Sequence, residues 1–255
     1  MSDYPRAFYD ELKTTALPSA RRVVPLLREL MSVERAVDVG CGDGGWLKVL
    51  AETGTQTVLG LDGDWVRDDQ LLIPPEKFLR CALGEALPVA ERFDLAISLE
   101  VAEHLPQTQA SGFVKELTRL APIVLFSAAI PGQGGLNHVN EQWPAYWSAL
   151  FEAQGFQPVD TLRWRIWDDD QVTWWYKQNL LLFAANEALT ANPALAQARD
   201  ACTPGAPPSV VHPERYQELA RQLRPGFGRW LKMGRGTIAR SLGLSRARRD
   251  RKPGS

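Results

Sequence analysis

The chain has 255 residues, of which 45% are hydrophobic, and its 29 basic and 30 acidic residues give a formal net charge of −1. This composition supports a sizeable core and excludes a mainly disordered chain. The length suits one α/β domain with appendages, or two units. No apolar run reaches the length of about 18 residues that a bilayer requires, so we expect no membrane-spanning helix.

The first residues and the cysteines indicate the compartment. The segment MSDYPRAFYDELK carries acids and no apolar stretch, so we expect no secretory signal. Cys41, Cys81 and Cys202 are widely spaced, which excludes a disulfide framework and a CxxC metal pair. We therefore expect a reducing, cytoplasmic location.

Charge is unevenly distributed along the chain. From Arg221 to Ser255 there are eleven basic residues and one acid, a charge of +10, which leaves −11 for residues 1–220. Such a basic tail is typical of a solvated end or of a segment that meets the phosphates of anionic lipid or nucleic acid. Its mixture of apolar side chains and arginines makes peripheral contact with the inner face of a membrane one alternative, whereas its glycines oppose a stable helix.

Hydrophobic periodicity predicts the elements in chain order. Residues 1–35 are predicted to be helical, with breaks at Pro18 and Pro25. Apolar runs then alternate with helical patterns, which is typical of a doubly wound, largely parallel sheet. The predicted strands are 36–40, 57–62, 93–99, 122–130, 156–167 and 179–186, and the predicted helices among them are 46–54, 108–121 and 142–154. A helical extension, 187–224, with a helix over 212–224, and the basic tail, 225–255, complete the expected organisation around a domain spanning 36–186.

A glycine-rich loop follows the first predicted strand and opens a helix. In AVDVGCGDGGW, Gly40, Gly42 and Gly45 fit GxGxxG, and Gly40, Gly42 and Gly44 fit GxGxG. Glycine is needed where the chain turns sharply and a ligand touches bare backbone, and the helix N-terminus adds partial positive charge. Dinucleotide-binding enzymes use the same device, so the loop alone leaves the ligand open.

Two acidic residues near the glycine loop indicate which kind of ligand it binds. Asp38 lies inside the first strand, where a buried carboxylate would repel a pyrophosphate but accept an ammonium or sulfonium. Asp62 ends the second strand, 22 residues after Gly40, which suits an acid that accepts both hydroxyls of an adenosine ribose. The ligand is therefore expected to carry an adenosine at one end and a cation near the loop.

Three motifs in order, VDVGCGDG, GLDGD and RFDLAISLEVAEHLP, resemble those of class I S-adenosylmethionine-dependent methyltransferases over about residues 33–186. The resemblance implies a Rossmann-like fold, with a mostly parallel seven-stranded sheet and helices on both faces, and S-adenosyl-L-methionine as cofactor. It places a set of residues around that cofactor: Asp38, Gly40, Cys41, Gly42, Gly44, Asp62, Gly63, Leu83 and Leu99. Where the family often has an acid near the adenine, this chain has Ala82, so backbone around Ala82 and Leu83 is expected to make that contact.

Histidines near the ends of two strands are the candidates for catalysis. A hydroxyl acceptor would need a general base, and His104 and His138 follow the fourth and fifth predicted strands, with Glu103 beside His104. We expect one of the two histidines to be the base. His212 is expected to be structural or on the surface.

The same residues allow a metal-dependent alternative. Glu100, Glu103 and His104 have the spacing ExxEH, which, with His138, resembles the metal-binding set of small-RNA terminal ribose methyltransferases. Related ExxEH sequences need no metal, so we expect none. The alternatives are an RNA ribose 2'-O-methyltransferase with a divalent metal, which the acidic body disfavours, an NAD(P)-dependent oxidoreductase, and a non-catalytic binding module.

Aromatic residues are concentrated between Trp143 and Tyr176. Helical spacing predicts that Trp143, Tyr146, Trp147 and Phe151 belong to the core. Four tryptophans could line a substrate cleft or pack a final hairpin: Trp164, Trp167, Trp174 and Trp175. The stretches NHVNEQWPAYW and WYKQN resemble bacterial methyltransferases of glycan and secondary-metabolite pathways, which implies a hydroxyl of a sugar or other small polar acceptor.

Overall fold

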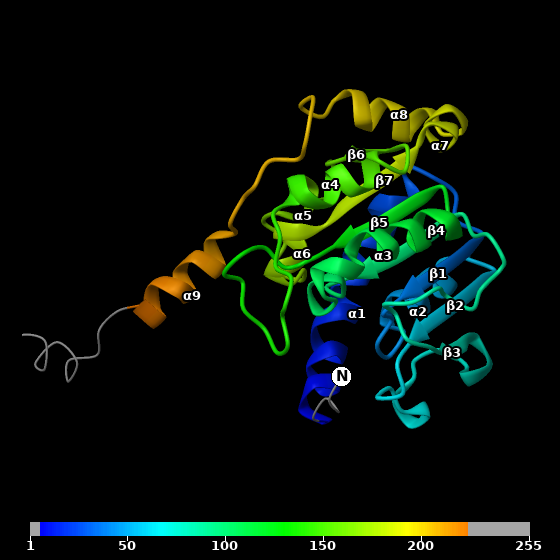
Figure 1. Ribbon diagram of the computed structural model, residues 1–255, viewed down its shortest axis with the longest axis horizontal. Helices are drawn as coiled ribbons and strands as arrows, with labels where there is room; N and C mark the ends of the chain where they lie inside the picture. The colour runs from blue at the N-terminus through cyan, green and yellow to red at the C-terminus, as the bar shows by residue number, and fades with distance from the viewer. Residues whose placement is uncertain (1–5, 224–255) are drawn as a thin grey trace, which may run out of the picture. The chain divides into compact units, whose positions relative to one another are not determined.

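A computed structural model describes residues 6–223, and its contacts divide the chain after His212 (Figure 1). The first unit holds the sheet and every element up to His212. Of the second unit, helix α9 (Pro213–Leu223) is described, and the basic tail lies outside the described residues. No helix of the described part is both long enough and apolar enough to cross a membrane.

The first unit is built on one seven-stranded sheet in the order β3-β2-β1-β4-β5-β7-β6. The strands are β1 (Arg35–Val39), β2 (Thr57–Asp62), β3 (Phe78–Arg80), β4 (Leu95–Leu99), β5 (Ile123–Ser127), β6 (Phe156–Val159) and β7 (Leu181–Ala185). All neighbours pair in parallel except β7, which runs antiparallel to both β5 and β6. The predicted fold class, a mostly parallel doubly wound sheet, is confirmed.

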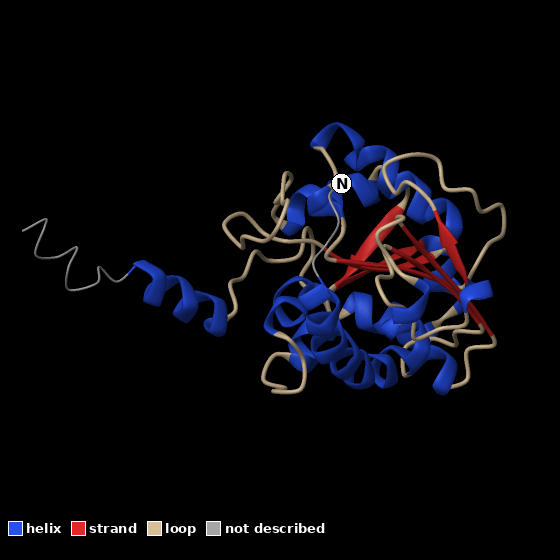
Figure 2. Cartoon of the chain, turned by 90° about the horizontal axis from the view of Figure 1, so that it is seen from below, coloured by secondary structure: helices blue, strands red, loops and turns tan. Residues whose placement is uncertain are grey.

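Helices cover both faces of the sheet, as Figure 2 shows. One apolar cluster joins the sheet to α1 (Arg6–Arg28), α2 (Gly45–Glu52), α5 (Leu162–Ile166), α6 (Trp174–Asn179), α7 (Asn186–Ala191) and α8 (Pro193–Asp200). The other joins it to α3 (Gln107–Leu120) and α4 (Pro144–Glu152). Strand β1 shows the alternation that this requires, because Ala36 belongs to the first cluster and Val37 to the second.

Helix α1 corrects one prediction. It runs without interruption through Pro18 and Pro25, which were expected to break it. A proline inside a helix costs about 3 kcal/mol, but Ala20, Val23 and Leu27 are completely buried on one side of the helix. Burial of this apolar stripe offsets the cost, and the helix packs against α2.

The predicted strand over 156–167 is also wrong in its extent. Strand β6 stops at Val159, and helix α5 begins at Leu162. Leu162 and Ile166, four residues apart, are both buried, which is helical spacing. The turn also places the Arg163 guanidinium against the Asp160 carboxylate, with hydrogen bonds of 2.7 and 2.6 Å, so this buried cation has a partner.

Candidate functional site

The glycine loop lies between β1 and α2 and bends through left-handed backbone. Gly40, Gly42 and Gly44 have φ of 86°, 55° and 81°, a region that side chains rarely adopt. A Cβ on Gly40 would collide with the Val101 side chain, so this glycine also permits close contact with the segment that follows β4. The loop therefore adjoins the region of the predicted catalytic residues.

The backbone amides of this loop are directed at protein acceptors. Gly40 and Cys41 donate to the Leu61 carbonyl at 2.7 and 3.1 Å. Gly42 donates to Asp62 Oδ2 at 2.7 Å. Gly44 donates to the Cys41 carbonyl, and Gly45 to Asp43 Oδ1. A diphosphate-binding loop presents such amides to its ligand, whereas these five hold the loop to its own chain.

Carboxylates gather where the loop meets the sheet. Asp38, Asp43 and Asp62 are all buried, and burial, together with the charges of Asp62 and Asp43, raises the pKa of Asp38 well above its usual value. Burial also raises the pKa of Asp62 to about 6, against hydrogen bonds from Gly42, Gly63 and the Trp65 indole. Within the described part of the chain, no lysine or arginine shifts the pKa of Asp38 or Asp62. Such a site favours a positively charged ligand group.

The other predicted cofactor residues surround this cluster in different ways. Gly63 donates to Asp62 Oδ1 at 2.7 Å. The Cys41 thiol is buried, and a Cβ on Gly60 would lie only 2.7 Å from its sulfur. Leu99 is the last residue of β4, and Leu83 is buried just beyond β3. The edge of the sheet at which β1, β2, β3 and β4 end thus gathers the predicted set.

The segment after β4 carries two of the predicted carboxylates. Glu100 has a φ of 55°, unusual for a residue with a side chain, and its amide donates to both the Ser127 carbonyl and hydroxyl. Glu103, in the short helix η3 (Ala102–His104), is completely buried. Burial and the nearby Glu100 raise the pKa of Glu103 well above normal, and neither of its carboxyl oxygens has a hydrogen bond of good geometry within the described residues.

The structure brings His104 and His138 together. Their ring centroids are 4.8 Å apart, edge to face. The contact depends on the Glu103 carbonyl, which accepts hydrogen bonds from the Val139 and Asn140 amides and so fastens the loop after β5 to η3. Burial, with the neighbouring His138, lowers the pKa of His104 to about 4, so the His104 imidazole is neutral at pH 7.

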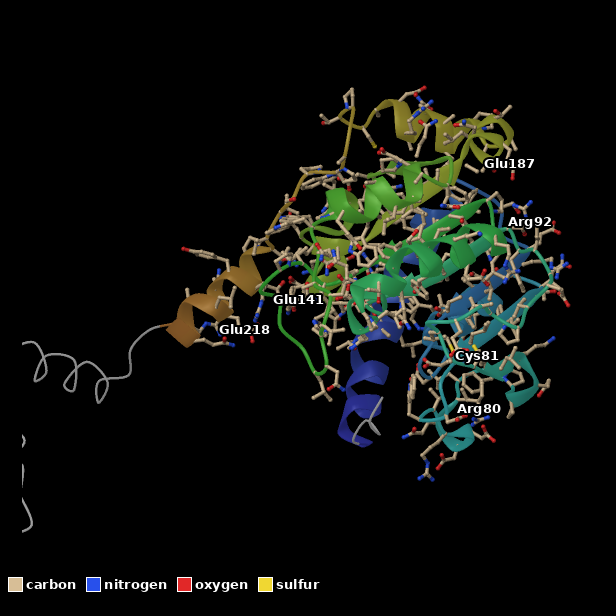
Figure 3. The ribbon with its side chains drawn as sticks, viewed as in Figure 1. Arg80, Cys81, Arg92, Glu141, Glu187 and Glu218 are labelled. Atoms are coloured by element: carbon tan, nitrogen blue, oxygen red, sulfur yellow. The ribbon has the colours of Figure 1, made fainter. Side chains whose placement is uncertain are left out.

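Each ring nitrogen of His138 faces a carboxylate, one from a residue predicted for the site and one from a residue that was not predicted. Its Nε2 lies 4.0 Å from Oε1 of Glu103, and its Nδ1 lies 3.0 Å from Oε1 of Glu141. Glu141, which is labelled in Figure 3, was not singled out in the sequence. Glu103, His104 and His138 also place one potential metal-ligating atom each within 4.8 Å of one another.

A buried network of amide side chains backs Glu100 and was likewise missed. Gln133 Nε2 donates to Glu100 at 2.8 Å, and Asn179 Nδ2 donates to it at 3.1 Å. Gln178 Nε2 donates to Gln133 and to Asn179. The stretch WYKQN contains two of these residues, but their partners lie about 45 and 79 positions away, so spacing along the chain gives no signal.

His212 is structural, as expected, and connects to the same network. Its amide donates to Gln178 Oε1 at 2.9 Å, and its Nε2 lies 3.0 Å from the Trp167 carbonyl. Arg163 reaches the network from another side, because it donates to the Gln178 carbonyl and to the Pro208 carbonyl. The segment before α9, which contains Pro208 and His212, is thereby hydrogen-bonded to Arg163 and to the amide network behind Glu100.

The aromatic residues do not form one cleft. Trp147 and Phe151 are buried as predicted, but Trp143, expected in the core, is 40% exposed because it precedes α4 as its N-cap. Trp164 lines a pocket of about 390 Å³ between α5 and the segment 201–208. Trp175 packs instead beside Tyr176 and the core on α1.

Comparison with known proteins bears on the class. A model described as "Methyltransferase domain" matches residues 37–122. The ubiquinone biosynthesis O-methyltransferase of Rhodopseudomonas palustris (strain BisB18) is 28% identical over 171 residues, which cover 62% of each chain. Our chain thus spans less than two thirds of this curated relative.

Solved structures of methyltransferases also align with this chain. CalS10, an amino pentose methyltransferase from Micromonospora echinaspora solved with S-adenosylmethionine, is 14% identical, with 73% of this chain and 99% of that chain covered and a TM-score of 0.53. An O-methyltransferase family protein from Burkholderia thailandensis is 12% identical, with coverage of 70% and 58% and a TM-score of 0.49.

The sheet order is that of a Rossmann-like fold, and residues 37–122 match a methyltransferase domain. The resemblance to class I S-adenosylmethionine-dependent methyltransferases inferred from the three motifs is confirmed. The donor of this class is S-adenosyl-L-methionine, and the acidic, cation-favouring cluster around Asp38 and Asp62 fits that molecule.

Proposed function

We propose that this chain transfers a methyl group from S-adenosyl-L-methionine to a hydroxyl of a sugar or another small polar acceptor. The observation that carries the proposal is the close approach of the glycine loop to the segment after β4 that leads to the histidines. A Cβ on Gly40 would lie 2.3 Å from Val101 Cγ2, and Val101 immediately precedes the short helix that contains Glu103 and His104. A cation-favouring site and a pair of histidines thus adjoin at one edge of the sheet.

The residues at the ends of β1 and β2 would hold the donor. Asp38 would face its positively charged groups, Asp62 would accept the ribose hydroxyls, and Leu83 and Leu99 would contribute apolar contact. Gly40, Cys41, Gly42, Gly44 and Gly63 would form the backbone around it. When bound, the donor supplies a methyl group already activated on a sulfonium, so the chain must mainly align the acceptor and accept its proton.

His138 is the better candidate for the base. Its Nδ1 is within hydrogen-bonding distance of a carboxylate, whereas the pKa of His104, about 4, makes that imidazole a weak proton acceptor at pH 7. We therefore assign proton removal to His138. Neutral His104 and the buried Glu103 would shape the space in front of His138 Nε2.

The surroundings favour an uncharged or cationic acceptor. Glu100, Glu103 and Glu141 lie on this side of the site, and the amide side chains of Gln133 and Asn179 back Glu100. Phosphate groups would be repelled by Glu141, whose pKa, despite burial, is held below its usual value by hydrogen bonds with His138, Gly132 and Gly134, and by the net negative charge of residues 1–220, which disfavours RNA. The names of the similar proteins, an amino pentose methyltransferase and an O-methyltransferase, agree with a sugar-like acceptor and with oxygen as the methylated atom.

A transfer assay with donor carrying a radioactive methyl group tests the proposal. Methyl glycosides, the corresponding amino glycosides, sugar phosphates and a short RNA would be offered in parallel. Label should appear on a hydroxyl of a neutral or amino glycoside and not on the phosphorylated sugars. Labelling of the RNA alone would support the ribose 2'-O-methyltransferase alternative instead. Reduction of a carbonyl substrate by NAD(P)H would support the oxidoreductase.

A divalent metal is a second candidate feature, and one observation favours it. The atoms of Glu103, His104 and His138 lie close enough to share an ion, and the Glu103 oxygens lack good hydrogen bonds within the described residues. Glu100, the fourth member of the ExxEH set, is instead bonded to Gln133 and Asn179. Activity after EDTA treatment, with and without restored Mg²⁺ or Mn²⁺, separates the cases, because unchanged activity excludes the metal.

We propose from the sequence that the chain is cytoplasmic and contacts a membrane peripherally through its basic tail. Residues 225–255 carry most of the basic excess and lie outside the described part of the chain. Flotation of the full chain with anionic and with zwitterionic vesicles tests it. Binding to anionic vesicles alone, weakened by salt, supports the contact. Equal recovery with both vesicle types contradicts it.

A further inference from the structure

Glu141 is held in place by the loop that connects β5 to α4. Its Oε2 accepts the Gly132 amide and its Oε1 accepts the Gly134 amide, both at 2.7 Å. Gly132 and Gly134 have φ of 82° and 71°, and this left-handed backbone lets two nearby amides converge on one carboxylate. The position of the Glu141 carboxylate is therefore set before any ligand binds.

The hydrogen-bonding role of Glu141 follows from these contacts. The Gly132 and Gly134 amides donate to it at 2.7 Å, and the His138 ring lies 3.0 Å from its Oε1. A carboxylate surrounded by N–H groups in this way accepts hydrogen bonds from all of them. The His138 nitrogen that faces it, Nδ1, must carry the proton.

The second nitrogen of His138 is consequently the one that can accept a proton. With the hydrogen on Nδ1, a neutral imidazole has its lone pair on Nε2. Nε2 lies toward Glu103, at a distance of 4.0 Å that is too long for a hydrogen bond. Gly135 packs against the imidazole so closely that a Cβ there would overlap it, which limits rotation of the ring.

We propose that Glu141 is a positioning residue, which fixes the tautomer and orientation of His138 so that Nε2 receives the proton of the acceptor hydroxyl. This inference rests on the proposed function. As the acceptor oxygen bonds to the methyl carbon, its proton passes to Nε2 and the carbon–sulfur bond breaks, with its electron pair left on sulfur. The ionised Glu141 stabilises the resulting imidazolium, which then releases its proton to water.

Nitrogen NMR of the ¹⁵N-histidine-labelled full chain tests the assignment without any acceptor. The chain has three histidines, so single substitutions assign their signals. We expect His138 to show a protonated Nδ1 and an unprotonated Nε2. Glu141→Ala should shift His138 toward the Nε2-protonated form or an exchanging mixture. Glu152→Gln, at the exposed end of α4, is the matched control and should change nothing.

The kinetic readout separates positioning from a purely structural role. With an acceptor found in the transfer assay, Glu141→Gln should lower kcat about 10- to 100-fold and leave affinity for S-adenosylhomocysteine unchanged, which also shows that the variant is folded. A wild-type Nε2-protonated tautomer, or a tautomer that Glu141→Ala leaves unchanged, overturns the inference. Absence of transfer to any hydroxyl would instead overturn the proposed function and leave the tautomer result intact.

Discussion

The proposed donor side, around Asp38 and Asp62, and the proposed acceptor side, around Glu100 and His138, are built in different ways. On the donor side, Asp38, Gly42 and Asp62 lie within one β-loop-α-β segment, and backbone amides bond directly to the key carboxylate. On the acceptor side, side chains from the segment after β4, the loop after β5 and helix α6 meet in one hydrogen-bonded network, which the backbone amide of His212 joins. Local sequence determines the first, whereas tertiary packing assembles the second.

The largest effect is expected on the acceptor side, at the proposed base. His138→Ala should lower the rate of methyl transfer by about 10²- to 10⁴-fold, the usual contribution of a positioned base. Affinity for S-adenosylhomocysteine, measured by calorimetry, should stay the same. His104→Gln is the comparison variant and should lower the rate less. Equal losses in both variants would contradict the assignment of the base.

The buried Arg163–Asp160 pair tests whether packing supports the acceptor side. Arg163 is completely buried and also bonds to the Gln178 carbonyl, so Arg163→Ala leaves Asp160 without its cation. The free energy of unfolding in urea should fall by about 3–5 kcal/mol. Arg165→Ala on the same helix removes an exposed pair with Glu29 and should leave the free energy of unfolding close to that of the wild type. Similar losses in the two variants would contradict this account of α5.

On the donor side, replacing Asp62 should weaken binding of S-adenosylhomocysteine and leave the structure of the acceptor side unchanged. Asp62→Ala removes the carboxylate expected to accept the ribose hydroxyls, worth about 1.5–3 kcal/mol, so calorimetry should show S-adenosylhomocysteine affinity reduced roughly 10- to 150-fold. The exposed Asp170, changed to Ala, is the control. The histidine signals should stay at their wild-type positions in Asp62→Ala. Unchanged affinity would remove Asp62 from the site.

The smallest effect is a pH dependence of binding. Because burial raises the pKa of Asp62 to about 6, the carboxylate is ionised above this pH and gains a proton below it. Protonation removes one acceptor for the ribose hydroxyls, so S-adenosylhomocysteine affinity should weaken as the pH falls from 7 to 5, by at most about tenfold per unit. Asp62→Ala should lose the part of this dependence centred near pH 6. A wild-type affinity that strengthens in acid would contradict the assignment.

The sequence predicted most of the fold and the donor side because both depend on local patterns. Apolar runs located β1, β2, β4, β5 and β7 to within a few residues, and the glycines located the loop. The errors arose where tertiary contacts override local signals. Helix α1 continues through Pro25 because its apolar side is buried, and α5 replaces a predicted strand where Arg163 needs Asp160.

On the acceptor side, the sequence supplied the histidines but not their partners. His104 and His138 were recognisable because each follows a strand. Glu141 was not, because its role depends on two left-handed glycines and a loop that folds back on itself. Gln178 and Asn179 are ordinary polar residues until β7 and α6 place them beside Glu100.

The central claim is that buried carboxylates at the ends of β1 and β2 select a positively charged adenosine donor in place of a redox dinucleotide. Calorimetric titration of the purified full chain with S-adenosylhomocysteine and, separately, with NADH and NADPH tests it most directly. We predict saturable one-to-one binding of S-adenosylhomocysteine, weakened in Asp38→Asn, and no binding of either nicotinamide dinucleotide. Binding of NADH or NADPH without binding of S-adenosylhomocysteine would contradict the claim.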